Sequence, residues 1–141
     1  MTRPTPLLRT LLFVPGDRPD RIVKAVASGA DGVAIDLEDA VATAQKDAAR
    51  ASVRSALHAL PDDGLAVLCV RINAIDSGLA EDDVAALEPV LHRLALVIVP
   101  MSADPDGIGC AAALLERAER SAGGIGPDRG AGRPFSVDSG Q

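Results

Sequence analysis

Aromatic residues are almost absent from this sequence of 141 residues, which has no tryptophan, no tyrosine and two phenylalanines. Proteins that bind single-stranded nucleic acid stack the bases on aromatic side chains, and Phe13 and Phe135 are too few to build such a surface. Basic residues are also in the minority, because 14 Lys and Arg stand against 20 Asp and Glu, which gives a formal net charge of −6. A chain of this charge repels phosphate backbones, so we expect no nucleic-acid partner.

Long apolar runs are missing as well. No run is longer than that of residues 94–99, whereas a membrane-spanning helix needs about 20 residues. The apolar stretch near the N-terminus, residues 11–14, ends at a Pro-Gly-Asp sequence and is too short for the core of a signal peptide. Cys69 and Cys110 are too few for a zinc site or a disulfide framework. We therefore expect a cytoplasmic protein with no membrane partner.

The apolar residues form a repeating pattern of strands and helices. Short runs rich in Val, Leu and Ile predict strands buried on both faces, as in parallel sheets; they span residues 11–14, 33–37, 66–72 and 95–99. Helical spacing follows each run: from Pro19 to near Gly29, over about 44–60, over 84–91 with a break at Pro89, and from about 110 to 121. This order predicts an α/β protein with parallel strands. Either a small open doubly wound sheet or half of a (β/α)₈ barrel fits the pattern.

Two further regions carry structural expectations. The second helix has a polar face of Lys46, Arg50, Arg54 and His58, which we expect to be solvated. Residues 122–141 hold six of the 13 glycines and show no apolar period, so we expect a disordered, glycine-rich tail with no fifth strand. The chain then divides into a folded part, residues 1–121, and this tail.

Acidic residues follow the second predicted strand, where ligands bind in parallel α/β folds, beyond the carboxyl ends of strands. Asp36, Glu38 and Asp39 place three acids within four residues, which is unfavourable unless a cation or hydrogen-bond donors offset the repulsion. Oxygen ligands of this kind suit Mg²⁺. In the alternative interpretation, Asp36 and Asp39 cap the following helix while Glu38 meets solvent.

The other strand ends carry further candidates. Arg71 ends the third strand and can clamp a substrate carboxylate with two parallel hydrogen bonds, or it forms a salt bridge to Glu38 or Asp39; both can hold at once. Asn73 either orients a ligand oxygen or begins a turn. After the first strand, Gly16 lets the backbone approach a ligand or simply makes a turn, and Arg18 meets a phosphate group or is solvated.

Three segments together resemble one protein family: LFVPGDRP at 12–19, DLEDAV at 36–41 and VRIN at 70–73. They are similar to the citrate lyase beta-subunit-like branch of the HpcH/HpaI aldolase/citrate lyase family, and residues 44–46 and 49–50 also resemble it. The resemblance covers about residues 11–99 and, more loosely, the chain up to residue 126. It implies a (β/α)₈ barrel lyase that uses Mg²⁺. Such enzymes cleave or form a carbon–carbon bond between an acyl-CoA and a 2-oxo acid, with citryl-CoA or malyl-CoA as typical substrates.

The resemblance also implies roles for single residues. Arg71 matches the family arginine that binds the substrate carboxylate, and Glu38 and Asp39 match acids near the metal, which we expect to contact it through water. The family's direct metal ligands, a glutamate and an aspartate, come from later strands and have no counterpart in this sequence. The fourth strand, which ends in Pro-Lys in the family, ends in Pro100-Met101 here.

Three hypotheses for function follow. The first is the N-terminal half barrel of a Mg²⁺-dependent carbon–carbon lyase, truncated and of impaired activity on its own. Its candidate residues are catalytic Arg71, Glu38 and Asp39, and substrate-binding Arg71, Asn73, Gly16 and Arg18. The second is a non-catalytic half barrel whose open sheet edges pair in a homo-oligomer. The third is a pyruvate-type class II aldolase of the same superfamily, against which the Pro-Gly-Asp-Arg motif argues.

Overall fold

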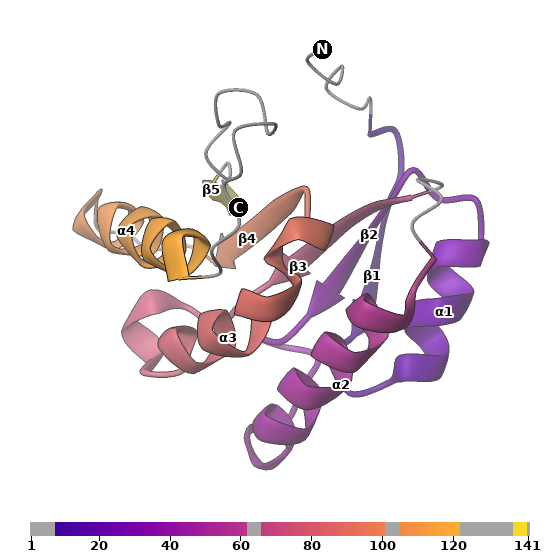
Figure 1. The fold of residues 1–141 in the computed structure, drawn as a ribbon, viewed down its shortest axis with the longest axis horizontal. Helices are drawn as coiled ribbons and strands as arrows, with labels where there is room; N and C mark the ends of the chain where they lie inside the picture. The colour runs from indigo at the N-terminus through magenta and orange to yellow at the C-terminus, as the bar shows by residue number, and fades with distance from the viewer. Residues whose placement is uncertain (1–7, 62–65, 101–104, 122–136, 141) are drawn as a thin grey trace.

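Strands and helices alternate along the chain in the computed structural model, which describes residues 8–61, 66–100, 105–121 and 137–140 (Figure 1). The strands are β1 (Leu11–Pro15), β2 (Gly32–Asp36), β3 (Val67–Arg71), β4 (Leu96–Pro100) and β5 (Val137–Gly140). The α-helices are α1 (Pro19–Ala27), α2 (Lys46–Ala59), α3 (Ala80–Leu87) and α4 (Pro105–Ser121). The 3₁₀ helices are η1 (Thr43–Gln45), η2 (Ile75–Ser77) and η3 (Glu88–Arg93). The predicted α/β class and its four βα units are confirmed.

The strand order decides between the two architectures that the pattern left open. All five strands are parallel, in the order β1-β2-β3-β4-β5. Each strand thus lies beside its predecessor, as in a barrel wall, whereas the order of a doubly wound sheet reverses at a switch point. The helices cover one face of the sheet, because all four join the same apolar cluster as the strands (Figure 1). The fold is therefore a partial (β/α)₈ barrel.

That apolar cluster is built from alternate strand residues and one side of each helix. Its strand members include Val14, Ile35, Val70 and Val97, and its helix members include Ile22, Val53, Val84 and Leu115. Because successive side chains of a strand point to opposite faces, the residues between these strand members face away from the helices. Asp36 and Arg71, which are in register on β2 and β3, lie on that other face.

A fifth strand corrects the expectation for the glycine-rich segment. Residues 137–140 pair in parallel with β4, from Val97 opposite Val137 to Pro100 opposite Gly140. Side-chain pattern fails to predict this strand because the ladder is made by main-chain N–H and C=O groups, which nearly every residue carries. The rest of the expected disordered tail, residues 122–136, lies outside the described residues, as does Met101.

Local signals predict most helix boundaries correctly. Pro19 begins α1, and Gly29, just beyond its end, has a φ of 85°, which glycine adopts without strain. The break at Pro89 is confirmed, because the chain passes there from α3 into η3. Helix α4 begins at Pro105, earlier than predicted. No helix in the described part of the chain has the length and apolar character needed to cross a membrane.

The polar face of α2 is less solvated than predicted. Arg54 and His58 are exposed as expected, but Lys46 and Arg50 are only 8% and 7% exposed. Both side chains reach away from the helix to the segments that surround the strand ends, where carbonyl and carboxylate groups accept their hydrogen bonds. Helical spacing cannot reveal these partners, because they come from other elements of the fold.

Candidate functional site

The carboxyl ends of the first four strands place four residues in one row. Pro15 pairs with Asp36, Asp36 with Arg71, and Arg71 with Ile98. Residues in register on parallel strands point to the same face, and none of these four belongs to the cluster under the helices. Asp36 and Arg71 are therefore neighbours on the face that a closed barrel would enclose.

A bidentate ion pair joins Asp36 and Arg71. Nε of Arg71 donates to Oδ1 at 3.0 Å and Nη2 donates to Oδ2 at 2.5 Å. Asp36 is 2% exposed and also accepts the backbone N–H groups of Glu38 at 2.8 Å and Ala40 at 3.1 Å. Burial raises the pKa of Asp36, but the Arg71 side chain and these two N–H groups outweigh it and hold the pKa below its ordinary value. Asp36 is thus an ionised anchor for Arg71.

Arg71 keeps donors for a further ligand. Its side chain is 26% exposed, and its guanidinium carbon lies 5.1 Å from the centre of the Phe13 ring, a favourable cation–π separation. Of the five N–H donors of a guanidinium, the bonds to Asp36 use two, on the edge formed by Nε and Nη2. The edge formed by Nη1 and Nη2 has the geometry to donate two parallel hydrogen bonds to another carboxylate. The hydrogen bond to Asp36 also raises the pKa of Arg71.

The expected salt bridge between Arg71 and Glu38 is present, although it is longer than the ion pair between Arg71 and Asp36. Oε1 of Glu38 is 3.9 Å from Nε of Arg71, and Asp39 is exposed. The principal partner of Arg71 is Asp36, because in-register pairing places the two side by side. Burial and the neighbouring charge of Asp39 raise the pKa of Glu38. The site therefore holds one strongly ionised carboxylate and one whose charged form is disfavoured.

The alternative interpretation, in which Asp36 and Asp39 cap the following helix, is wrong, because Ala42 and Gln45 occupy the N-cap positions of η1 and α2 and no side chain caps either helix. The two oxygens of Asp36 instead accept backbone N–H groups from Glu38 and Ala40 in the turn that follows β2. That turn precedes the first helical residue, Thr43 of η1. Asp36 thus holds this turn and forms the ion pair with Arg71, a partner that the sequence patterns do not predict.

A buried polar network holds the loop after β2 in place. Nζ of Lys46 donates to the carbonyl oxygens of Leu37 at 2.7 Å and Glu38 at 2.6 Å. Nδ2 of Asn73 donates to the carbonyl of Leu37 at 3.0 Å and to Oδ2 of Asp83 at 2.6 Å. The amide nitrogen of Asn73, a predicted substrate ligand, thus bonds to the protein itself. These donors, with Arg71, offset the repulsion among the acids of the loop.

Asp83 on α3 is the centre of this network. The residue is 0% exposed and accepts the backbone N–H of Asn73 and Nε of Arg50, both at 2.7 Å. Arg50 also donates to Asp47 at 2.7 Å and to the carbonyl of Leu79 at 3.2 Å. The sequence patterns do not single out Asp83, and they place Arg50 on a solvated helix face, whereas the structure buries it. A carboxylate among three consecutive acids on a helix gives no local sign that it is buried.

Gly16 and Arg18 occupy different environments after β1. The N–H of Gly16 donates to the carbonyl of Asp36 at 2.8 Å, and a Cβ at position 16 would lie 2.9 Å from that oxygen and from Cγ2 of Val53. The close approach that glycine permits here is to the protein's own backbone. Arg18 is exposed at the start of α1, with Nε 3.6 Å from the Asp20 carboxylate.

The acids of the loop do not amount to a metal centre by themselves. The described residues contain no group of three or more His, Cys, Asp or Glu side chains that could hold a metal ion. Both oxygens of Asp36 already accept hydrogen bonds from Arg71. Among the residues present, Glu38 and Asp39 are the carboxylates that remain for a contact to a metal through water.

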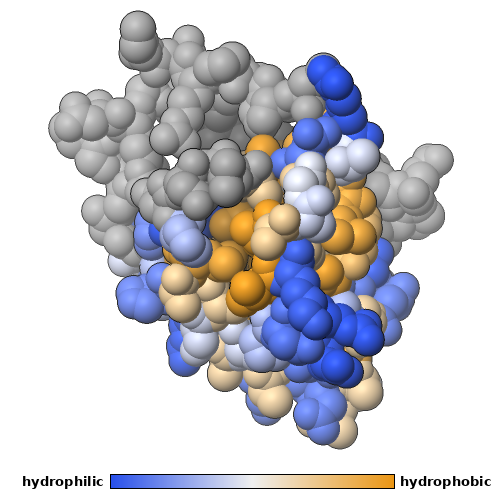
Figure 2. Space-filling model, turned by 90° about the vertical axis from the view of Figure 1, so that its right-hand side faces the viewer, coloured by the Kyte–Doolittle hydropathy of each residue, from blue (hydrophilic) through white to orange (hydrophobic). Residues whose placement is uncertain are grey.

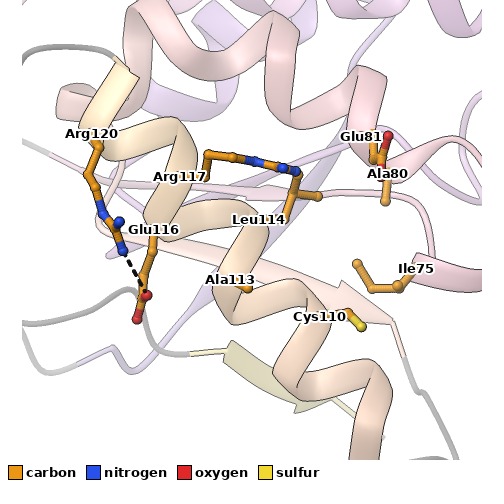
Figure 3. Close-up of a pocket in the computed structure, with 9 residues that line it drawn as sticks. All are labelled: Ile75, Ala80, Glu81, Cys110, Ala113, Leu114, Glu116, Arg117 and Arg120. Carbon is orange, nitrogen blue, oxygen red and sulfur yellow. Dashed lines mark ion pairs between the residues drawn. The ribbon is translucent and has the colours of Figure 1, made fainter.

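A separate hollow of about 490 Å³ lies between α4 and the start of α3 (Figure 3). Ile75, Ala80 and Leu114 contribute apolar surface, and Arg117 extends along the hollow on the side of α4. Arg120 of the same helix forms an ion pair with Glu116 at 3.6 Å. None of the lining residues belongs to the row at the strand ends. We therefore place the candidate site at the strand ends, where parallel barrels bind their ligands.

Comparison with known proteins points to one family. A model of the HpcH/HpaI aldolase/citrate lyase family matches residues 9–135. The chain is 44% identical over 81 residues to the citrate lyase subunit beta of Leuconostoc mesenteroides subsp. cremoris, a match that covers 57% of this chain and 26% of that subunit. It is 39% identical over 126 residues to an L-malyl-CoA/beta-methylmalyl-CoA lyase of Cereibacter sphaeroides, covering 84% of this chain and 37% of the lyase.

Solved structures of citrate lyase beta subunit and CitE proteins are also similar to this chain. The citrate lyase beta subunit of M. tuberculosis, complexed with oxaloacetate and magnesium, superposes with a TM-score of 0.58 at 38% identity, covering 72% of this chain and 42% of that one. A structure of the protein CitE from the same organism, in complex with magnesium, acetoacetate and coenzyme A, superposes with a TM-score of 0.51 at 30% identity, covering 82% of this chain and 47% of that one. The chain thus spans less than half the length of these relatives.

Proposed function

This chain belongs to the HpcH/HpaI aldolase/citrate lyase family, and from that premise we propose that it contributes to a carbon–carbon lyase acting between an acyl-CoA and a 2-oxo acid in the cytoplasm. Two kinds of relative support the proposal: the citrate lyase beta subunit and the malyl-CoA lyases. Among the structural neighbours, one is complexed with oxaloacetate and another with acetoacetate and coenzyme A. Citryl-CoA and malyl-CoA are the substrates to examine first.

The observation that carries the proposal is the fixed guanidinium of Arg71. In the cleavage of a 3-hydroxyacyl-CoA of this kind, the hydroxyl loses its proton and becomes the carbonyl of a 2-oxo acid as the carbon–carbon bond breaks. The electron pair of that bond passes to the carbon next to the thioester, which takes up a proton to give acetyl-CoA. The carboxylate beside the new carbonyl must therefore be held in a fixed position. Asp36 locks Arg71 through one edge of its guanidinium, and the other edge has the geometry to bind the carboxylate.

The remaining candidates have supporting roles in the proposal. Glu38, whose pKa is raised, and the exposed Asp39 are proposed as the catalytic acids next to the bound oxo acid. Arg18, exposed beyond the end of β1, is proposed to meet a phosphate group of the substrate. Gly16 and Asn73 are proposed to shape the site, because they donate hydrogen bonds to the carbonyl of Asp36, which ends β2, and to that of Leu37, which follows it.

Magnesium is proposed as the cofactor at the level of the family, since structures of relatives contain it. The described residues of this chain do not assemble a complete ligand set, so none of the roles above depends on the metal. Glu38 and Asp39 would contact the ion through water. We expect millimolar Mg²⁺ to leave the melting temperature of this chain unchanged, and a clear rise would show that the chain holds a complete ligand set.

The test of the proposal is a comparison of three variants by isothermal titration calorimetry with oxaloacetate and pyruvate. Arg71→Ala removes the clamp, and Arg71→Lys keeps the charge but loses the planar fork. Hydrogen bonds to charged groups contribute about 1.5–3 kcal/mol each, so Arg71→Ala, which removes both bonds of the clamp, should weaken binding by at least about 100-fold. Arg54→Ala, which changes an exposed arginine of α2, is the matched control.

Unchanged affinity in a folded Arg71→Ala variant would place the carboxylate site elsewhere. Release of the 2-oxo acid from malyl-CoA and citryl-CoA, followed with a coupled dehydrogenase, measures the reaction itself. We expect Arg71→Ala to lose the release of 2-oxo acid and Arg54→Ala to retain it. This expectation applies to whichever of the two substrates the wild-type chain cleaves.

One observation favours a second candidate function, a half barrel that assembles with a copy of itself. Leu11, Leu12 and Phe13 of β1 are 39–47% exposed and Val23 of α1 is 56% exposed. Apolar side chains gather across this side of the molecule (Figure 2), and no described strand pairs with the outer edge of β1. Light scattering should then give a dimer that Leu12→Asp converts to a monomer, whereas a monomeric wild type contradicts this candidate.

A further inference from the structure

Lys46 occupies a position that is unfavourable for a lysine in two respects. It is the first residue of α2, where the positive end of the helix dipole repels a cation. It is also only 8% exposed, and withdrawing an ammonium group from water is unfavourable unless strong acceptors replace the lost hydration. The surrounding structure must therefore supply a specific compensation for burying a charge at this point.

The compensation comes from two consecutive carbonyl groups of the site loop. Nζ of Lys46 lies 2.7 Å from the carbonyl oxygen of Leu37 and 2.6 Å from that of Glu38. Both are distances of strong, charge-assisted hydrogen bonds. The loop that carries the acids therefore wraps over a cation that belongs to the protein.

One peptide group links Lys46 to the ion pair of the site. The carbonyl of Leu37 and the N–H of Glu38 belong to the same planar peptide. The carbonyl accepts from Lys46, while the N–H donates to Oδ1 of Asp36 at 2.8 Å. Oδ1 of Asp36 in turn accepts Nε of Arg71 at 3.0 Å. A cation on the carbonyl side polarises the peptide and strengthens the bond made by its N–H.

We propose that Lys46 is a positioning residue of this site, which orients the Leu37–Glu38 peptide and through it holds Asp36 and Arg71 in the geometry that binds a 2-oxo acid. The inference rests on the proposed function for the identity of the ligand. The ammonium of Lys46 donates to the carbonyls of Leu37 and Glu38, and its effect on Arg71 passes through the Leu37–Glu38 peptide and the Asp36 carboxylate.

The first experiment compares Lys46→Met with Lys24→Met by calorimetric titration of oxaloacetate. The methionine keeps the length of the apolar stem and removes the donors, and Lys24 is an exposed lysine of α1 that serves as the control. Partners that orient a binding group commonly change affinity by about 10–100-fold. We expect Lys46→Met to weaken binding by at least about tenfold at this scale and Lys24→Met to leave it unchanged.

The second experiment needs no ligand and therefore separates this inference from the proposed function. Hydrogen exchange of the Arg71 Nε–H, observed by ¹⁵N NMR, reports how firmly Asp36 holds the guanidinium. We expect exchange in Lys46→Met to be at least tenfold faster than in the wild type. Leu57→Ala, which opens the fully buried core of α2 away from the site, lowers stability without this change and controls for a merely structural effect.

The outcomes are distinguishable. A wild type that binds no oxo acid refutes the proposed function, while the exchange rates still decide on Lys46. Unaltered exchange in folded Lys46→Met overturns the positioning role even where oxo-acid binding stands. If the methionine variant does not fold, Lys46→Gln, which keeps N–H donors without the charge, takes its place, and it is expected to show intermediate exchange. Wild-type exchange in Lys46→Gln also overturns the inference.

Discussion

Replacement of Asp83 by alanine should lower the free energy of unfolding by a large amount, because this one small side chain serves several buried donors. The side chain is fully buried and accepts three hydrogen bonds: from Nε of Arg50 at 2.7 Å and from the backbone and side-chain nitrogens of Asn73 at 2.7 and 2.6 Å. Asp83→Ala leaves all three donors without this acceptor. A buried donor left unpaired costs about 1–3 kcal/mol, and more where it is charged.

Breaking a buried ion pair by removing one partner costs about 3–5 kcal/mol. We expect Asp83→Ala to fall within that range and not above it, because Arg50 keeps its bonds to Asp47 and to the carbonyl of Leu79. The assay is urea denaturation followed by circular dichroism, with the free energy of unfolding extrapolated to water. Asp82→Ala is the matched control, because it removes an exposed acid from the same first turn of α3.

A double variant tests the cause of the loss. Adding Arg50→Met to Asp83→Ala removes the buried charge that the single variant leaves uncompensated. The two changes should therefore be less destabilising together than the two single effects added, with a coupling of about 0.5–3 kcal/mol. Two results would refute the reasoning. Asp83→Ala could prove no more destabilising than Asp82→Ala, or the effects of Asp83→Ala and Arg50→Met could prove purely additive.

Three further predictions concern the site and the thiols. Gly16→Ala should lower the free energy of unfolding by about 1–3 kcal/mol, because the new Cβ would lie 2.9 Å from the carbonyl oxygen of Asp36. The control is Gly109→Ala in α4, where a Cβ meets nothing within 4 Å, and this variant should lose no stability in the same denaturation assay. The pKa of Asp36 is lowered from 3.8 on folding, so its stabilisation is present above pH 3.8 and is lost as the pH falls through the folded-state value. Asp36→Asn should therefore flatten the acid side of the stability profile, and an unchanged slope contradicts the assigned ion pair. Burial raises the pKa of Cys69 to about 11, whereas Cys110 is exposed. A thiol reagent at neutral pH should therefore label Cys110 quickly and Cys69 only after unfolding. Rapid labelling of both cysteines would contradict the burial of Cys69 in the sheet.

Local patterns in the sequence are sufficient to predict the first four strands and most of the helices. Apolar runs placed the first four strands, and helical spacing with proline and glycine signals placed α1 and α2 and the break at Pro89. These features depend on neighbours within a few residues, since strand alternation and helix contacts repeat every two and about 3.6 residues. The strand-end motifs also identified the family, which the comparisons confirm.

The principal partners within the site are not accessible from the same patterns. These patterns predict the salt bridge of Arg71 with Glu38, which is present, but they do not predict its shorter bonds to Asp36. They also place Lys46 and Arg50 in solvent, where the structure buries both. Asp36 and Arg71 are 35 residues apart, and their pairing follows from the register of β2 on β3. Local patterns thus fail to predict the role of a residue when its partner belongs to another element of the fold.

The sequence by itself determined the class of the protein, its βα order and the residues that end its strands, because these follow from local periodicity and from motifs read along the chain. Only the tertiary structure decided that Asp36 anchors Arg71, that Asp83 and Lys46 are buried beneath the loop, and that residues 137–140 add a strand to β4. The physical reason is that a side chain's charge and hydrogen bonds are satisfied by whatever the packing of distant strands and helices brings within about 3 Å.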